Sequence, residues 1–196
     1  MLDPSATDDG HDHRRVGRGG PPRTPIVAGL IVAALLTAGI VAAVRLGFGG
    51  STPTGAAIAK GRPAPDVAGM TLDGAPFRLA DQRGHPVIVN FWGPSCVPCR
   101  TEFPLLKAKA QEHAPDGLVI VGVLMDDPPQ PARDFVRTYG ATWPTVVDPD
   151  GRLRAAYQAV ARPQTYFIDG GGILRAIQIG EVVASDFERQ YATIEP

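Results

Sequence analysis

The residues with the most evident chemistry are two cysteines, Cys96 and Cys99, separated by Val97 and Pro98. They are the only cysteines in the chain, so no set of disulfides can staple the fold. A structural zinc site usually takes four ligands. The histidines, at positions 11, 13, 85 and 113, do not stand at spacings that would complete one. The pair therefore predicts thiol–disulfide redox chemistry, with no metal and no cofactor other than its own disulfide.

The sequence around this pair predicts how its two sulfur atoms differ. The apolar run Pro86–Trp92 ends just before the pair, and a helical pattern covers Val97–His113. Cys96 therefore stands at a helix N-terminus, where free N–H groups and the helix dipole favour a thiolate. Cys99 follows one helical turn later, at a Cα–Cα distance of about 5 Å that suits a disulfide. We expect Cys96 to be the exposed nucleophile and Cys99 the less exposed residue that resolves the mixed disulfide.

Glu102 follows Cys99 by three residues, so the two positions lie within about 60° of each other on a helix. Its carboxyl group could accept the proton that Cys99 must lose before it attacks. The spacing fits a solvated helix glutamate equally well, and both interpretations stay open at this point.

Strand and helix patterns alternate around the cysteine pair. A hairpin is predicted at Asp73-Gly74, between Met70–Leu72 and Phe77–Leu79. The other predicted strands are Pro86–Trp92, Leu118–Met125, Thr145–Val147, Thr165–Ile168 and Ile173–Ile179. The predicted helices, besides the one that carries the cysteines, are Ala132–Tyr139, Gly151–Gln158 and Ser185–Tyr191. This order predicts an α/β domain whose central sheet is covered by helices on both faces.

The N-terminal part of the chain has a different composition. Residues 1–25 are polar and predict a disordered tail. Residues 26–44 are uncharged and apolar, and as a helix they would span roughly 28 Å, close to the hydrocarbon core of a membrane. Residues 45–64, rich in small residues and proline, predict a flexible linker. Residues 65–196 are then long enough to form the catalytic domain.

Charged residues predict the orientation of this single-pass anchor. The arginines just before it are Arg14, Arg15, Arg18 and Arg23, whereas Arg45 is the only basic residue directly after it. The positive-inside rule therefore places the N-terminus in the cytoplasm and the domain outside the cell membrane. A cleavable signal peptide, with its site near Ala42 and Ala43, is the alternative. The net charge of −1 predicts no nucleic-acid partner.

Several short motifs point in one direction when they are taken together. They are Ala64-Pro65-Asp66, Asn90-Phe91-Trp92-Gly93, Cys96-Val97-Pro98-Cys99-Arg100, Glu102-Phe103-Pro104 and Pro163-Gln164-Thr165-Tyr166-Phe167-Ile168-Asp169. With them, the sequence from about Gly61 to Glu188 resembles the TlpA/ResA/CcmG-like family of membrane-anchored thioredoxin-fold thiol–disulfide oxidoreductases. The resemblance implies a thioredoxin fold, with a mixed central sheet flanked by helices, an N-terminal β-hairpin and a central insert, after one transmembrane helix.

The resemblance also implies roles for individual residues. Glu102 matches an active-site glutamate of the family, and Pro163 matches a cis-proline that lies opposite the cysteine motif. The backbone of Arg162 would then be exposed for strand-like pairing with a substrate chain. Trp92, Arg162 and Pro163 are accordingly expected to bind substrate.

Two residues depart from the family pattern, and both are expected on the substrate surface. The family usually has tryptophan just before the first cysteine, where this chain has Ser95. The residue before the cis-proline is more often small or apolar, where this chain has Arg162. A cationic side chain near Cys96 would further favour its thiolate.

By resemblance, the expected reaction is reduction of disulfides in exported proteins, with apocytochrome c as the leading candidate and a membrane thiol transporter as electron donor. Oxidising relatives usually carry histidine inside the motif, where this chain has Val97-Pro98. A peroxiredoxin-type peroxidase is one alternative, but it needs threonine or serine at the position of Gly93. An SCO-like copper carrier is the other, but it needs wider cysteine spacing and a downstream histidine, and no histidine follows His113.

Overall fold

The computed structural model describes residues 58–196. The predicted tail, the predicted membrane anchor at 26–44 and most of the predicted linker fall in residues 1–57, outside this described part. Among the helices of residues 58–196, none is both long enough and apolar enough to cross a membrane.

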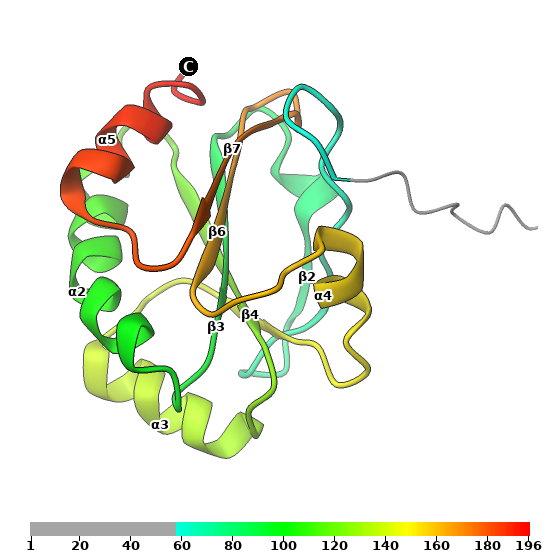
Figure 1. The fold of residues 1–196 in the computed structure, drawn as a ribbon, viewed down its shortest axis with the longest axis vertical. Helices are drawn as coiled ribbons and strands as arrows, with labels where there is room; N and C mark the ends of the chain where they lie inside the picture. The colour runs from blue at the N-terminus through cyan, green and yellow to red at the C-terminus, as the bar shows by residue number, and fades with distance from the viewer. Residues whose placement is uncertain (1–57) are drawn as a thin grey trace, which may run out of the picture. The chain divides into compact units, whose positions relative to one another are not determined.

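A five-stranded sheet forms the centre of the domain (Figure 1). Its strands are β3 (Val87–Trp92), β4 (Val119–Leu124), β5 (Thr145–Val147), β6 (Gln164–Ile168) and β7 (Leu174–Ile179). They are arranged in the order β5-β4-β3-β6-β7, with β3 parallel to β4 and antiparallel to β6. The predicted mixed sheet is confirmed, and the strand that leads to Cys96 is its central one.

The two faces of the sheet are covered differently. One face packs against α2 (Val97–Glu112), α3 (Pro129–Tyr139) and α5 (Ala184–Tyr191). The other face packs against the hairpin of β1 (Ala68–Met70) and β2 (Pro76–Arg78), the 3-10 helix η1 (Leu79–Gln82) and α4 (Arg152–Tyr157). Figure 1 shows these two groups on opposite sides of the strands. Helices on both faces are therefore confirmed, although on the second face they are short and share the cover with a hairpin.

Alternation along β3 decides which side chains reach the cysteines. Ile88 and Trp92 belong to the cluster under α2, α3 and α5, whereas Val89 and Phe91 belong to the cluster on the opposite face. Asn90 has the same parity as Ile88 and Trp92, so it points toward the helix that carries the disulfide. A polar side chain is thereby placed in the middle of the core, beneath α2.

The predicted boundaries differ most from the structure at the hairpin and at α3, and several others differ by one residue. The strands of the hairpin are Ala68–Met70 and Pro76–Arg78, because the Leu72 N–H instead donates to the carbonyl of Thr145 in β5. Helix α3 begins at Pro129, earlier than predicted, since a proline in the first helical turn lacks only an N–H that would have had no partner there.

Candidate active site

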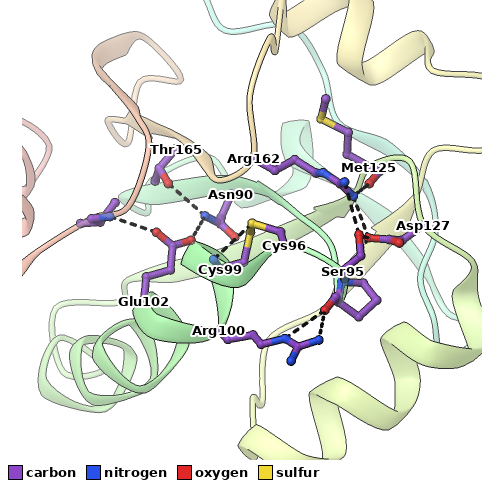
Figure 2. Close-up of a disulfide and its surroundings, with 12 residues drawn as sticks. Asn90, Ser95, Cys96, Cys99, Arg100, Glu102, Met125, Asp127, Arg162 and Thr165 are labelled. Atoms are coloured by element: carbon purple, nitrogen blue, oxygen red, sulfur yellow. Dashed lines mark hydrogen bonds and ion pairs between the residues drawn. A yellow bond between two sulfur atoms is a disulfide. The ribbon is translucent and has the colours of Figure 1, made fainter.

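Cys96 and Cys99 form a disulfide across the first turn of α2 (Figure 2). Their Cα atoms are 5.3 Å apart, close to the distance predicted for one helical turn. Cys96 caps the helix, and its Sγ accepts a hydrogen bond from the Cys99 N–H at 3.2 Å. Cys96 retains 7 % exposure and Cys99 has none. The predicted order of accessibility is confirmed, although Cys96 lies flush with the surface and does not project from it.

The helix start gives the two sulfur atoms different properties once the disulfide is reduced. The N–H donor and the positive end of the α2 dipole favour a thiolate at Cys96. Cys99 belongs to the apolar cluster beneath the helix, where burial favours the neutral thiol. Cys96 is therefore suited to attack, while Cys99 needs a group that takes its proton.

Glu102 lies one turn after Cys99 and is only 1 % exposed. Its Oε1 accepts a hydrogen bond from Asn90 Nδ2 at 2.8 Å, and its Oε2 accepts one from the Val182 N–H at 3.0 Å. Burial raises the pKa of Glu102 to about 7, and the nearby Glu181 raises it slightly more, while the two hydrogen bonds lower it. The alternative of a solvated helix glutamate is therefore wrong. A carboxyl group with this pKa can exchange a proton near neutral pH.

Asn90 links this carboxyl group to the neighbouring strand. Its Nδ2 also donates to Thr165 Oγ1 at 3.0 Å, so β3, α2 and β6 meet in one hydrogen-bonded chain. Among the residues that the structure describes, nothing pairs with the Asn90 Oδ1 atom. Figure 2 shows Glu102, Asn90 and Thr165 together on one side of the disulfide.

The Arg162–Pro163 peptide bond is cis, as the resemblance implies. The Pro163 carbonyl accepts a hydrogen bond from the Gly180 N–H at 2.9 Å, which ties this turn to the end of β7. Within residues 58–196, the backbone N–H and C=O of Arg162 are paired with no other group. They remain open to an extended chain that docks beside Cys96.

The side chain of Arg162 is held by an ion pair. Its Nη1 lies 2.7 Å from Asp127 Oδ2 and 2.6 Å from the carbonyl oxygen of Met125. Ser95 donates to the same Asp127 oxygen, from its N–H at 3.2 Å and from its hydroxyl at 2.8 Å. The two departures from the family pattern are therefore joined through one carboxylate, on the other side of the disulfide in Figure 2. Because Asp127 pairs with Arg162, it opposes the effect on the Cys96 thiolate that was expected from an unpaired arginine.

Trp92 does not lie on the substrate surface, and its predicted contact with substrate is wrong. Its side chain is fully buried, and its ring packs against the rings of Phe103 at 4.7 Å and Phe135 at 5.0 Å between centroids. The physical reason is the alternation of β3, which directs Trp92 into the core beneath α2 and α3. It supports the helix that carries the cysteines.

Sequence reasoning did not single out Asp127 or Thr165 as site residues. Asp127 follows β4, the parallel neighbour of β3, and carboxyl ends of parallel neighbours meet at one edge of a sheet. That rule could have placed Asp127 near Ser95. Thr165 stands in the motif after Pro163, but only its pairing opposite Asn90 reveals its partner.

A group of possible metal-binding side chains lies at the other end of α2 from the disulfide. It comprises Glu112, His113 and Glu188. The Lys109 ammonium forms ion pairs with both glutamates, at 2.6 Å from Glu112. The two glutamates of this group are therefore already paired with the protein's own cation.

A dithiol pair that opens the helix after the central strand of such a sheet defines the thioredoxin-fold thiol–disulfide oxidoreductases, and this protein is an enzyme of that class. The chain belongs to the AhpC/TSA family, whose model matches residues 60–177. Its relatives include thiol-disulfide oxidoreductases named ResA, so the resemblance found in the sequence is confirmed.

Two relatives and one solved structure illustrate this placement. The thiol-disulfide oxidoreductase ResA of Geobacillus kaustophilus is 34 % identical over 140 residues, covering 71 % of this chain and 80 % of that protein. The thioredoxin-like protein YneN of Bacillus subtilis is 33 % identical over 136 residues, covering 68 % and 79 %. A thiol:disulfide interchange protein of the thioredoxin family from Chlorobium tepidum superposes with a TM-score of 0.63 at 28 % identity, covering 68 % and 96 %.

Proposed function

We propose that this oxidoreductase works as a reductase for disulfides of exported proteins, with its domain held outside the cytoplasm by the N-terminal anchor. Apocytochrome c, which carries a Cys-x-x-Cys-His motif, is the leading candidate substrate. The observation that carries disulfide exchange at this site is the buried carboxyl group of Glu102 one turn from the buried Cys99. A proton acceptor there assists the step in which Cys99 attacks, and that step releases reduced substrate. The reductive direction rests on the motif itself, which has Val97-Pro98 where oxidising relatives carry histidine.

The exchange proceeds in two displacements. The Cys96 thiolate attacks one sulfur of the substrate disulfide, so that the substrate S–S bond breaks and a mixed disulfide forms. The departing substrate sulfur leaves as a thiolate and takes a proton. Cys99 then loses its proton and attacks Cys96 Sγ, which closes the Cys96–Cys99 disulfide and releases the second substrate thiol. The substrate gains two electrons from the two cysteines and two protons, one lost by Cys99 and one from water, because Cys96 reacts as the thiolate.

The surroundings of the two cysteines fit these separate tasks. Cys96 has the N–H donor and the small exposed area that a nucleophile needs. Cys99 has no exposed area, so bulk water cannot readily take its proton. With a pKa of about 7, Glu102 is partly ionised near neutral pH and is the group that would receive this proton.

Substrate would dock as an extended segment across the loop that precedes Pro163. The free backbone groups of Arg162 supply hydrogen bonds of the strand-addition kind. Val97, between the cysteines, and Val160, just before this loop, are exposed apolar side chains that a substrate segment could cover. The backbone hydrogen bonds are independent of substrate sequence, as a general disulfide reductase requires.

The dithiol must be restored by an external donor. Outside the cytoplasm no soluble thiol pool persists, so a membrane thiol transporter would pass two electrons to the Cys96–Cys99 disulfide. The uncharged run at 26–44 and the arginines before it support this location.

The peroxidase alternative has a steric objection in this domain. That chemistry needs a hydroxyl side chain at position 93, and a Cβ atom there would lie 2.2 Å from Asp127 Oδ2 and 2.5 Å from Arg162 Nη1. A threonine or serine at position 93 would therefore displace the ends of these two side chains and break the present arrangement of the ion pair.

Trapping in cells tests the proposal. A full-length Cys99→Ser variant should accumulate mixed disulfides through Cys96 with exported proteins, apocytochrome c among them, because the resolving thiol is missing. The Cys96→Ser,Cys99→Ser chain is the matched control and should trap nothing. Adducts confined to cytoplasmic proteins would refute the proposed location and substrate class.

A further inference from the structure

Asp127 brings together two backbone segments that are distant in sequence. Ser95 immediately precedes Cys96. Arg162 immediately precedes the cis-proline Pro163, in the loop that faces the cysteines. The Asp127 carboxylate binds Ser95 through two hydrogen bonds and Arg162 through an ion pair. Ser95 and Arg162 also meet directly, at 3.4 Å between Oγ and Nη2. We call Ser95, Asp127 and Arg162 the rim clamp.

The Asp127–Arg162 pair of the rim clamp is largely shielded from water, whereas Ser95 is exposed. The side chains of Asp127 and Arg162 are 10 % and 23 % exposed, whereas most ion pairs of the described domain involve side chains that are much more open. The pair lies directly on the backbone of Gly93, since a Cβ atom there would meet both charged groups. Glycine at 93 therefore makes room for a close ion pair next to the chain that leads into Cys96. Shielding of this kind makes the pairing stronger than at an open surface.

We propose that Asp127 is a positioning residue that holds the segment before Cys96 against the segment before Pro163, through Ser95 and Arg162. Its carboxylate also cancels the charge of Arg162 beside Cys96. The proposal rests on the proposed function in that this rim is where substrate docks. With the rim clamp closed, the rim carries no net charge, so substrate segments of either charge can reach Cys96. Asp127 thereby prevents Arg162 from selecting for anionic substrates.

Opposite changes should follow from removing each partner. Asp127→Asn leaves a net positive charge at the rim, which favours the Cys96 thiolate and anionic substrates. Arg162→Gln leaves a net negative charge, which has the reverse effects. The double variant restores neutrality and should return toward the parent. A purely structural role would disturb the site in the same direction in all three.

The first measurement is the titration of the Cys96 thiol in full-length, detergent-solubilised chain carrying Cys99→Ser. Cys96 is then the only thiol in the protein. Other charged groups around the site, Arg100 on the helix, the buried Glu102 and the Asp126–Arg154 pair, stay the same in every variant. The midpoint should fall in Asp127→Asn, rise in Arg162→Gln and lie near the parent value in the double variant.

The second measurement is the rate of mixed-disulfide formation with two small probes, cationic cystamine and anionic dithiodipropionate. The ratio of the anionic to the cationic rate should rise on the order of fivefold in Asp127→Asn and fall by a similar factor in Arg162→Gln. Raised ionic strength should shrink both changes, because exposed probes are screened.

An exposed Asp–Arg pair that is not part of the rim clamp provides the control. Asp134 and Arg137 pair within α3 at the surface, and Asp134→Asn should change neither the titration nor the probe ratio. Shifts of equal sign in Asp127→Asn and Arg162→Gln, or no shift in either, would overturn the rim clamp. If the parent chain reduces no protein disulfide, the proposed function fails while the titration result still stands, so the two failures are distinguishable.

Discussion

Asn90 and Glu102 face each other across the interface between β3 and α2, with Asn90 Nδ2 donating to Glu102 Oε1 at 2.8 Å. The Val182 N–H donates to the second oxygen of this carboxyl group, which is otherwise enclosed by the core. A buried acid with two donors is stabilised as an anion, but not enough to offset its loss of water, and its pKa rises to about 7. The site therefore carries a neutral-pH proton acceptor at a measurable cost in stability.

Stability should fall with rising pH because of Glu102. Its pKa is about 7 in the folded state and near the ordinary value of 4.5 when unfolded, so the folded state binds the proton more tightly. The favourable contribution is complete below pH 4.5 and is lost as pH rises to about 7, for a total of about 3 kcal/mol. Glu102→Gln should lack this dependence and be the more stable protein above pH 7. Denaturant unfolding of the oxidised chain, in which no thiol titrates, measures it.

Glu195→Gln is the control for this experiment, because Glu195 is exposed near the C-terminus. It should retain the parent dependence on pH. A Glu102→Gln protein with the parent slope between pH 4.5 and 7 would show that Glu102 does not titrate as its burial requires.

Resolution of the mixed disulfide should also depend on Glu102. In the parent chain the rate of Cys99 attack should rise as pH passes about 7, when Glu102 becomes able to take the proton. Glu102→Gln should slow this step by about 10²-fold and remove that inflection. Single-turnover kinetics from a preformed mixed disulfide isolate the step. The initial attack by Cys96, measured in a Cys99→Ser chain, should change far less, and equal slowing of both steps would argue against a specific role in resolution.

Asn90→Ala should move the titration of Glu102 in a defined direction. The amide lowers the pKa of Glu102 by stabilising its anion, so its removal should raise that pKa further. The loss of stability with pH should then occur at higher pH than in the parent. Thr165→Val is a suitable comparison, because it removes the hydroxyl on the far side of Asn90 and leaves the Glu102 bond in place. If Asn90→Ala lowers the midpoint, the amide does not act as a donor to the anion.

The proposed membrane orientation can be tested in cells with single cysteines in a Cys96→Ser,Cys99→Ser chain. Asp73→Cys places a thiol in the exposed turn of the hairpin, and Ser5→Cys places one in the N-terminal tail. A membrane-impermeant maleimide should label the first variant and not the second in wall-stripped cells, with both labelled after lysis. Labelling of Ser5→Cys alone in wall-stripped cells would show the opposite orientation and contradict the proposal.

The sheet and the disulfide could be predicted from the sequence because both depend on local patterns. Strands buried on both faces read as continuous apolar runs, and one helical turn fixes the separation of Cys96 and Cys99. The burial of Glu102 could not be predicted in this way. The group that binds its second oxygen, Val182, lies 80 positions along the chain, so spacing within α2 left its environment open.

The rim clamp shows a second limit of sequence reasoning. Both Asp126 and Asp127 follow β4 at the edge where Cys96 lies, so the rule for parallel strands would place either one near it. Asp126 adopts a positive φ of 57° and pairs with Arg154, while Asp127 turns to Arg162. This choice depends on a backbone conformation that no pattern in the sequence specifies. Trp92 illustrates the opposite case, because the continuous apolar run of β3 already indicates burial on both faces, against the role suggested by its motif.

The division of labour between Cys96 and Cys99 is the central claim, and one measurement tests it most directly. The reduced full-length chain is mixed with an oxidised Cys-x-x-Cys-His peptide, and the products are counted by mass spectrometry of the intact protein. The parent should release one reduced peptide per dithiol and close its own disulfide. Cys99→Ser should accumulate a one-to-one mixed disulfide through Cys96, and Cys96→Ser should form almost none, because Cys99 has no exposed surface. Equal trapping by the two variants, or release of peptide by either, would contradict the account.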